Sequence, residues 1–192
     1  YDQFNAYLSE LARDQKAYEK YKELDASHGL TAQIIRYHLK EKKYSALMNF
    51  LKNAPAAERE RLEQEFIKLG QAPAATDPSK DAQEDRLTTF VNDLNTANQK
   101  DRAAVVQMLK LFDLNAVIDA LLVAVTSDDL QLVKGSLYAL RQLLPELDNN
   151  SIQQIIAVIK EILTTEKAVQ VRTEALNILS VVKRLKPVFA ER

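Results

Sequence analysis

The chain has 192 residues, 46% of them hydrophobic, and its 26 basic and 27 acidic residues leave a formal net charge of −1. This balance gives no overall field that would attract DNA, RNA or an anionic membrane. The chain has no cysteine, which excludes disulfides, thiolate catalysis and thiolate metal sites. Its longest candidate apolar stretch, residues 116–125, contains Asp119 and is about half the roughly 20 residues that span a bilayer, so we expect no membrane span.

The lack of cysteine fits a cytoplasmic protein, which is the localisation we expect. The sequence begins at Tyr1 instead of a methionine, which suggests that the native N-terminus is missing. Periplasmic and secreted localisations therefore stay open as alternatives.

Composition changes near residue 71, because nine of the thirteen aromatic residues precede that point. Two prolines and several small residues within 71–80 are typical of a linker. Three glycines in the whole chain and almost no strand-like alternation predict an all-α fold. We therefore expect an aromatic-rich helical lobe at 1–70, a Pro/Ala linker at 71–85 and a helical repeat domain at 86–192.

Four helices are predicted in the first lobe from the spacing of its apolar residues. The first ends near Ala26, because residues 27–29 supply a stop. Thr31 is expected to cap the second helix, and the fourth is expected to end at Gly70. The apolar faces of the second to fourth helices contain Ile34, Ile35, His38 and Leu39, then Tyr44, Leu47, Met48 and Leu51, then Leu62, Phe66 and Leu69.

Residues 114–147 and 152–185 carry one pattern twice, 38 positions apart. Each copy predicts a unit of two helices, and such a fixed period is typical of stacked helical repeats. A shorter, divergent pair at 86–94 and 100–112 precedes them, so three pairs are expected. The copies align Ile118 with Ile156, Leu121 with Ile159, Val125 with Leu163, Val133 with Val171, Lys134 with Arg172, Leu140 with Ile178, Leu144 with Val182 and Leu147 with Leu185.

A Val-Lys or Val-Arg pair at 133–134 and 171–172 opens the second helix of each copy, after an acidic turn at 128–129 or at Glu166. Together with the Leu and Ala ridges that follow, these residues resemble the HEAT-like and armadillo-like repeat family over about residues 86–186. The resemblance implies a curved α-solenoid of about three helix pairs. It implies no functional residues, because members of the family bind partners through different positions.

Lys134, Tyr138 and Arg141 share one face of a predicted second helix, and Tyr and Arg often anchor interfaces. By the family resemblance, Lys134 would instead tie adjacent turns together through Asp128 or Asp129. Tyr138 and Arg141 are therefore the predicted partner-binding residues of this helix.

Two further helices have more apolar surface than one buried stripe needs. The helix at 114–126 is apolar on nearly all sides, which predicts cover on several faces. In the last helix a second apolar face is predicted from Leu176, Leu179 and Val181, added to an inner stripe of Val171, Ala175, Ile178, Val182 and Leu185. We expect the first lobe, a partner chain or further repeats to cover that face, and an oligomer could form through it.

Signals for catalysis and for nucleic-acid binding are weaker. His28 and His38 lack motif partners, so we expect a turn residue and a packed side chain, with no catalytic residue, metal site or cofactor. Arg36, Lys40, Lys42 and Lys43 could follow a phosphate backbone, although a solvated helix face explains them better.

The sequence thus predicts a non-enzymatic protein–protein interaction or assembly module. Nucleic-acid binding through the basic residues of the first lobe is the alternative. An enzyme with a cleft between the two lobes is the weakest reading.

Overall fold

The computed structural model describes residues 15–54, 56–71, 87–96, 98–165 and 168–189. Within these ranges all regular structure is helical and no residue lies in a strand, which confirms the all-α prediction. The chain divides into two compact units, Tyr1–Arg86 and Leu87–Arg192. Of the predicted linker at 71–85, only Gln71 lies within the described residues, where it ends the last helix of the first unit.

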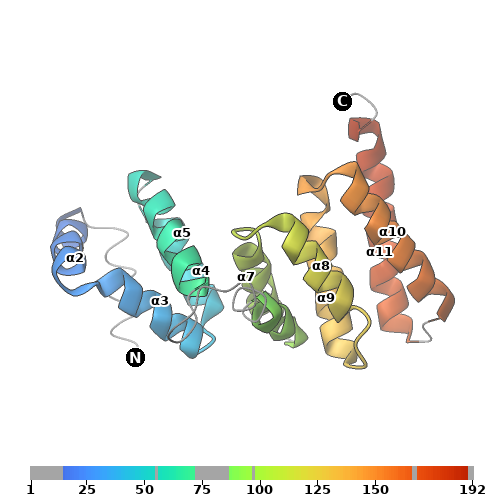
Figure 1. Cartoon of the computed structure of the whole chain (residues 1–192), viewed down its shortest axis with the longest axis horizontal. Helices are drawn as coiled ribbons and strands as arrows, with labels where there is room; N and C mark the ends of the chain where they lie inside the picture. Colours follow the sequence, from blue (N-terminus) through green and yellow to red (C-terminus); the bar gives the residue numbers. More distant parts are fainter. Residues whose placement is uncertain (1–14, 55, 72–86, 97, 166–167, 190–192) are drawn as a thin grey trace. The chain divides into compact units, whose positions relative to one another are not determined.

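The first unit contains α2 (Gln15–His28), α3 (Leu30–Lys40), α4 (Tyr44–Asn53) and α5 (Ala56–Gln71). Helix α3 contacts each of the other three and so forms the centre of this unit (Figure 1). The predicted apolar faces supply the core, whose buried members are Ile34, Ile35, His38, Tyr44, Leu47, Met48, Leu51, Leu62 and Phe66.

A single glycine forms the junction between α2 and α3. Helix α2 ends at His28, two residues beyond the predicted end near Ala26. Gly29 follows with φ 60 and ψ 44, the left-handed conformation that glycine adopts without steric cost. Of the predicted stop at residues 27–29, Ser27 and His28 still belong to α2, and Gly29 alone ends it; α3 begins directly after the glycine.

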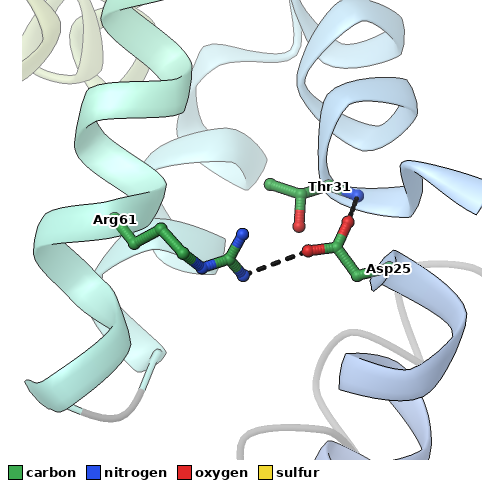
Figure 2. Close-up of polar contacts among 3 residues, drawn as sticks. All are labelled: Asp25, Thr31 and Arg61. Carbon is green, nitrogen blue, oxygen red and sulfur yellow. Dashed lines mark hydrogen bonds and ion pairs between the residues drawn. The ribbon is translucent and has the colours of Figure 1, made fainter. Parts of the chain in front are cut away.

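The prediction that Thr31 caps α3 is wrong, because Thr31 lies inside the helix and is buried. The cap comes from α2 instead: Oδ1 of Asp25 accepts a hydrogen bond of 2.7 Å from the backbone N–H of Thr31. The other carboxylate oxygen of Asp25 pairs with Nη2 of Arg61 in α5 at 3.0 Å (Figure 2). One carboxylate thus connects three helices.

The charge of Asp25 is stabilised by these partners. Burial raises the pKa of this carboxyl, but the hydrogen bonds from Thr31 and the guanidinium of Arg61 outweigh burial and hold the pKa below its ordinary value of 3.8. Only 10% of the Asp25 side chain is exposed, against 48% for Arg61. The carboxylate is therefore the better shielded half of the pair.

The second unit begins with a helix at residues 87–92, which continues as the 3₁₀ turn η1 (Asp93–Asn95). It goes on through α7 (Gln99–Leu109), α8 (Leu114–Ala124), α9 (Leu130–Leu143), the 3₁₀ turn η2 (Leu144–Glu146), α10 (Asn149–Thr165) and α11 (Val169–Phe189). Helices α8 and α9 pack as one antiparallel pair, and α10 and α11 as the next (Figure 1).

Short polar side chains fix the starts of the helices in this unit. Asn98, Asp113 and Asp129 each accept a hydrogen bond from a backbone N–H in the first turn of α7, α8 and α9, respectively. Asp148 does the same for α10, accepting from the N–H of Ser151 at 2.7 Å, and this bond holds its pKa below the ordinary value.

Helix α9 is the centre of the second unit. It contacts η1 and α7 on one side, α11 on the other, and α8 within its own pair, while α10 contacts α8 and α11. It packs closely on η1 at Gly135, where a Cβ atom would meet the carbonyl group and Cβ of Leu94. Glycine therefore allows the two backbones to come together here.

The prediction that the helix at 114–126 is covered on several faces is only partly right. Val117, Ile118 and Leu121 of α8 are buried, but Val123 is 73% exposed. Helix α8 packs on α9 and α10, and contact on these sides leaves its outer face open.

Among the helices of the described ranges, none combines the length and the apolar character that a membrane span requires.

Candidate protein-binding surface

Four of the seven aligned apolar pairs of the 38-residue pattern are buried in both copies, whereas Ile118, Val125 and Leu147 are buried and their aligned residues Ile156, Leu163 and Leu185 are half-buried. In both copies the aligned residues Leu121 and Ile159, Val133 and Val171, Leu140 and Ile178, and Leu144 and Val182 are all buried. The inner stripe of α11 is confirmed, since Val171, Ala175, Ile178 and Val182 are buried and Leu185 is half-buried. The alignment of the copies can therefore be used to compare α9 with α11 position by position.

Helices α9 and α11 meet through polar side chains at the edge of their contact. Nζ of Lys134 donates a hydrogen bond of 2.9 Å to Oε1 of Gln170. Nη1 of Arg141 lies 3.7 Å from Oε2 of Glu174. Because residues 134 and 141 are seven positions apart, they lie on one flank of α9, and this flank faces α11.

The expected contact of Lys134 with Asp128 or Asp129 is not present. The carboxylate of Asp129 is instead used at the start of α9, where it accepts hydrogen bonds from the N–H groups of Gln131 and Leu132. Lys134 instead contacts Gln170 at the start of α11.

Tyr138 and Arg141, the predicted partner-binding residues of α9, are both half-buried instead of exposed. The Tyr138 ring lies between two guanidinium groups, with Cζ of Arg102 at 6.0 Å and Cζ of Arg141 at 5.5 Å from its centroid. Such stacking contributes attraction in addition to packing. Both residues therefore already help to join α7, α9 and α11.

Leu176, Leu179 and Val181 do not form one face of α11, contrary to the prediction. At 3.6 residues per turn, Val181 shares a flank with Glu174, seven positions earlier, and Glu174 faces α9. Leu176 and Leu179 lie on the opposite flank, so the second apolar face is two separate surfaces. Leu176 is 53% exposed, whereas Leu179 and Val181 are half-buried.

The flank with Leu176 is the surface of α11 that corresponds to the contact flank of α9. Shifting Lys134, Tyr138 and Arg141 by 38 positions gives Arg172, Leu176 and Leu179. Lys183 continues this row one turn further, and Val169, which is 76% exposed, lies beside it near the helix start. We call Arg172, Leu176, Leu179 and Lys183, with Val169, the outer flank of α11. The sequence prediction missed Val169 and Lys183, although the spacing of four and seven residues could have shown them.

The four basic residues predicted to bind nucleic acid lie in α3 (Arg36 and Lys40) and in the turn after it (Lys42 and Lys43). Arg36, Lys40 and Lys42 are exposed, and Lys42 has a φ of 52. Lys43 is half-buried, and its Nζ donates to the hydroxyl of Tyr37 at 3.1 Å and lies 5.4 Å from the centre of that ring. Three of the four predicted nucleic-acid contacts are thus exposed, and the charge of Lys40 in the last turn of α3 is favourable there without a ligand.

The histidines fit structural roles. His28 is the last residue of α2. His38 is fully buried, and its Nδ1 lies 2.7 Å from the carbonyl oxygen of Ile34, so Nδ1 donates the proton. Its ring also packs edge-on against Tyr37, with centroids 5.3 Å apart. In the described ranges, no three His, Asp or Glu residues are grouped as a metal site would require.

Comparison with protein-family models, with curated proteins and with solved structures finds no match to this chain. The functional argument therefore rests on the geometry of the chain itself.

Proposed function

We propose that this chain is a non-enzymatic protein–protein interaction or assembly module. Its second unit would be a short α-solenoid of about three HEAT-like helix pairs, and the outer flank of α11 would be the surface that it presents to a protein partner. The two well-formed pairs, α8 with α9 and α10 with α11, support this proposal through their shared pattern of burial.

The observation that carries the proposal is the exposure of Leu176. The equivalent residue of α9, Tyr138, is half-buried, with Arg102 of α7 and Arg141 of its own helix over its ring. Leu176 occupies the same position in the following repeat and is 53% exposed, with the still more exposed Val169 two turns away. Two large apolar side chains exposed on one flank of a helix are what a protein-binding surface there would use.

Tyr138 and Arg141 have a supporting role in this proposal. Since they hold α9 against its neighbours, they would keep the flank rigid instead of contacting the partner directly. Rigid presentation lowers the entropic cost of binding, because few side chains have to be ordered when the partner arrives.

Co-purification of the tagged full chain from its native cell tests this function. The comparison is between the unsubstituted chain, Leu176→Asp, and Val123→Asp as a matched change at an exposed apolar residue of α8. We expect Leu176→Asp alone to reduce recovery of a specific protein, with unchanged helicity by circular dichroism. Equal recovery with all three chains would refute the proposed surface.

A further inference from the structure

Two arginines and a tyrosine form a half-buried cluster where α7 and α9 meet. Arg102 belongs to α7, whereas Tyr138 and Arg141 belong to α9. Both guanidinium groups lie over the same ring, with Cζ of Arg102 at 6.0 Å and Cζ of Arg141 at 5.5 Å from its centroid. We call these three residues the arginine–tyrosine cluster. Two positive charges are thus held at a single aromatic side chain.

Much of the hydrogen-bonding capacity of the two guanidinium groups is unused. Nη2 of Arg102 donates a hydrogen bond of 2.5 Å to the carbonyl oxygen of Thr96. Arg141 approaches the carboxylate of Glu174 only to 3.7 Å, which is beyond hydrogen-bond distance. The Nε atoms of both arginines are buried and have no hydrogen-bond partner in the part of the chain that the structure describes. Buried donors without an acceptor are unfavourable, so they indicate a place for water or a ligand.

This surface has three cations, Arg102, Lys134 and Arg141, that are only partly neutralised. Nζ of Lys134 donates to an uncharged amide, that of Gln170. Among the described residues, Glu174 is the one carboxylate within ion-pair distance of any of the three, with its Oε2 beside Arg141. Two positive charges in half-buried positions are therefore left without a counter-ion, which is unfavourable.

Ordered water cannot complete this surface alone. A water molecule accepts from an N–H group but brings no charge, so the half-buried cations keep their surplus. An oxyanion supplies acceptors and negative charge together. A guanidinium group presents its N–H groups in a planar fork that fits the oxygens of carboxylates and phosphates. The cluster is therefore suited to an oxyanion.

The amount of charge favours a phosphate group over a carboxylate. A phosphate ester carries about −1.5 to −2 charges at pH 7 and has three strong acceptor oxygens. A carboxylate carries one charge and has two oxygens. The surplus of two positive charges and the two guanidinium forks match the phosphate better.

We propose that Arg102 and Arg141 bind a phosphate group, with Tyr138 holding both guanidinium groups in place. The Arg141 side chain is 25% exposed, which gives a ligand access from solvent. The site lies on the flank of α11 that carries Glu174, opposite the flank of Leu176. It is therefore separate from the outer flank and does not depend on the proposed function.

Nitrogen-15 NMR of the full chain tests this inference, because each arginine Nε–H signal reports on its own guanidinium group. Inorganic phosphate is the probe, added at constant ionic strength with chloride as the counterpart. We expect saturable shifts of the Arg102 and Arg141 signals, and roughly tenfold weaker binding of acetate.

A phosphoserine peptide and its unphosphorylated form distinguish the sources of the phosphate. Tighter binding of the phosphorylated peptide than of inorganic phosphate would identify a phosphorylated protein segment as the ligand. Equal or weaker binding would identify a free phosphate. Both results require the same two guanidinium groups, so both support the site.

Substitutions with opposite expected effects provide the controls. Arg102→Gln should weaken phosphate binding roughly tenfold, because it removes a charged donor. Glu174→Gln should instead tighten binding roughly threefold, because it removes a repelling carboxylate beside Arg141. Arg36→Gln, a change at an exposed arginine of α3, should leave the affinity unchanged. Circular dichroism shows whether each variant is folded.

Three results would overturn the inference. No saturable shift of either arginine signal by phosphate would exclude the site. Acetate that binds as tightly as phosphate would assign the cluster to carboxylates instead. Phosphate affinity that neither Arg102→Gln nor Glu174→Gln changes would place the bound phosphate elsewhere on the chain. None of these results affects recovery of a partner through Leu176, which tests the proposed function by itself.

Discussion

Gly135 of α9 lies directly against the backbone of Leu94 in η1. A Cβ atom at position 135 would come within 2.8 Å of the Leu94 carbonyl carbon and would overlap its oxygen. Because the obstructing atoms are backbone, no side-chain rotation can relieve the clash. The close packing of α9 on the first helix of this unit therefore depends on glycine.

We expect Gly135→Ala to lower the free energy of unfolding by about 1–3 kcal/mol, the usual cost of overpacking, despite the higher helix propensity of alanine. Urea unfolding followed by circular dichroism measures the effect. Ser136→Ala is the control, since the Ser136 hydroxyl is buried without a hydrogen-bond partner among the described residues and its loss should be neutral or stabilising. A Gly135→Ala chain as stable as the original would contradict the close approach.

A second prediction concerns Asp25 and pH. Its pKa is held below 3.8 in the folded chain, so the unfolded carboxyl binds a proton more tightly and acid favours unfolding. The stabilisation is complete well above pH 3.8 and is lost as the pH falls through the lower, folded pKa. Asp25→Asn should therefore cost about 0.5–1 kcal/mol at pH 7, and this cost should shrink as the pH falls below 3.8.

Arg61→Gln separates the two partners of Asp25. It removes the ion pair with the more exposed residue but keeps the hydrogen bond from Thr31, so its cost at pH 7 should be the smaller one. Urea unfolding at several pH values measures both variants. A cost for Asp25→Asn that does not change with pH would exclude the carboxylate as the source of the stabilisation.

The start of α9 gives a third prediction. Asp129→Ala removes the side chain that accepts from the N–H groups of Gln131 and Leu132, and should cost about 1 kcal/mol. Asp128→Ala, a change at the exposed residue just before it, should cost much less. Similar losses for the two alanine variants would mean that the local negative charge matters, and not the cap.

A fourth prediction concerns the contact of the Tyr138 ring with Arg102 and Arg141. Tyr138→Leu keeps most of the packing but loses the attraction between ring and guanidinium, with an expected cost of about 0.5–2 kcal/mol. A double-mutant cycle with Arg102→Leu measures how much of this belongs to one pair. Additive losses would show that the Arg102 contact contributes nothing beyond packing.

Much of the fold follows from local sequence signals. The 3.6-residue spacing of Ile34, Ile35 and His38 correctly predicted a buried face, and Gly29 correctly marked the end of α2, two residues later than expected. These features depend on residues within one turn of each other, which a sequence displays directly. The 38-residue period likewise places equivalent buried residues in α9 and α11.

The features that the sequence did not show depend on contacts between distant residues. The cap of α3 comes from Asp25 in the preceding helix instead of Thr31, and the partner of Lys134 is Gln170, 36 positions away. Likewise, a sequence pattern gives no sign of which flank of α11 faces α9. The sequence prediction put Leu176 and Val181 on one face. The ion pair of Glu174 with Arg141 shows that the flank with Val181 faces α9, whereas Leu176 lies on the other flank.

The central claim is that the outer flank of α11 meets a protein partner. Site-specific photo-crosslinking in the native cell tests it most directly, with the reactive amino acid at position 176 and, in a second chain, at position 123 as an equally apolar and more exposed control. We predict a discrete protein adduct from position 176 and none from position 123. No adduct at 176, or the same adducts at both positions, would contradict the account.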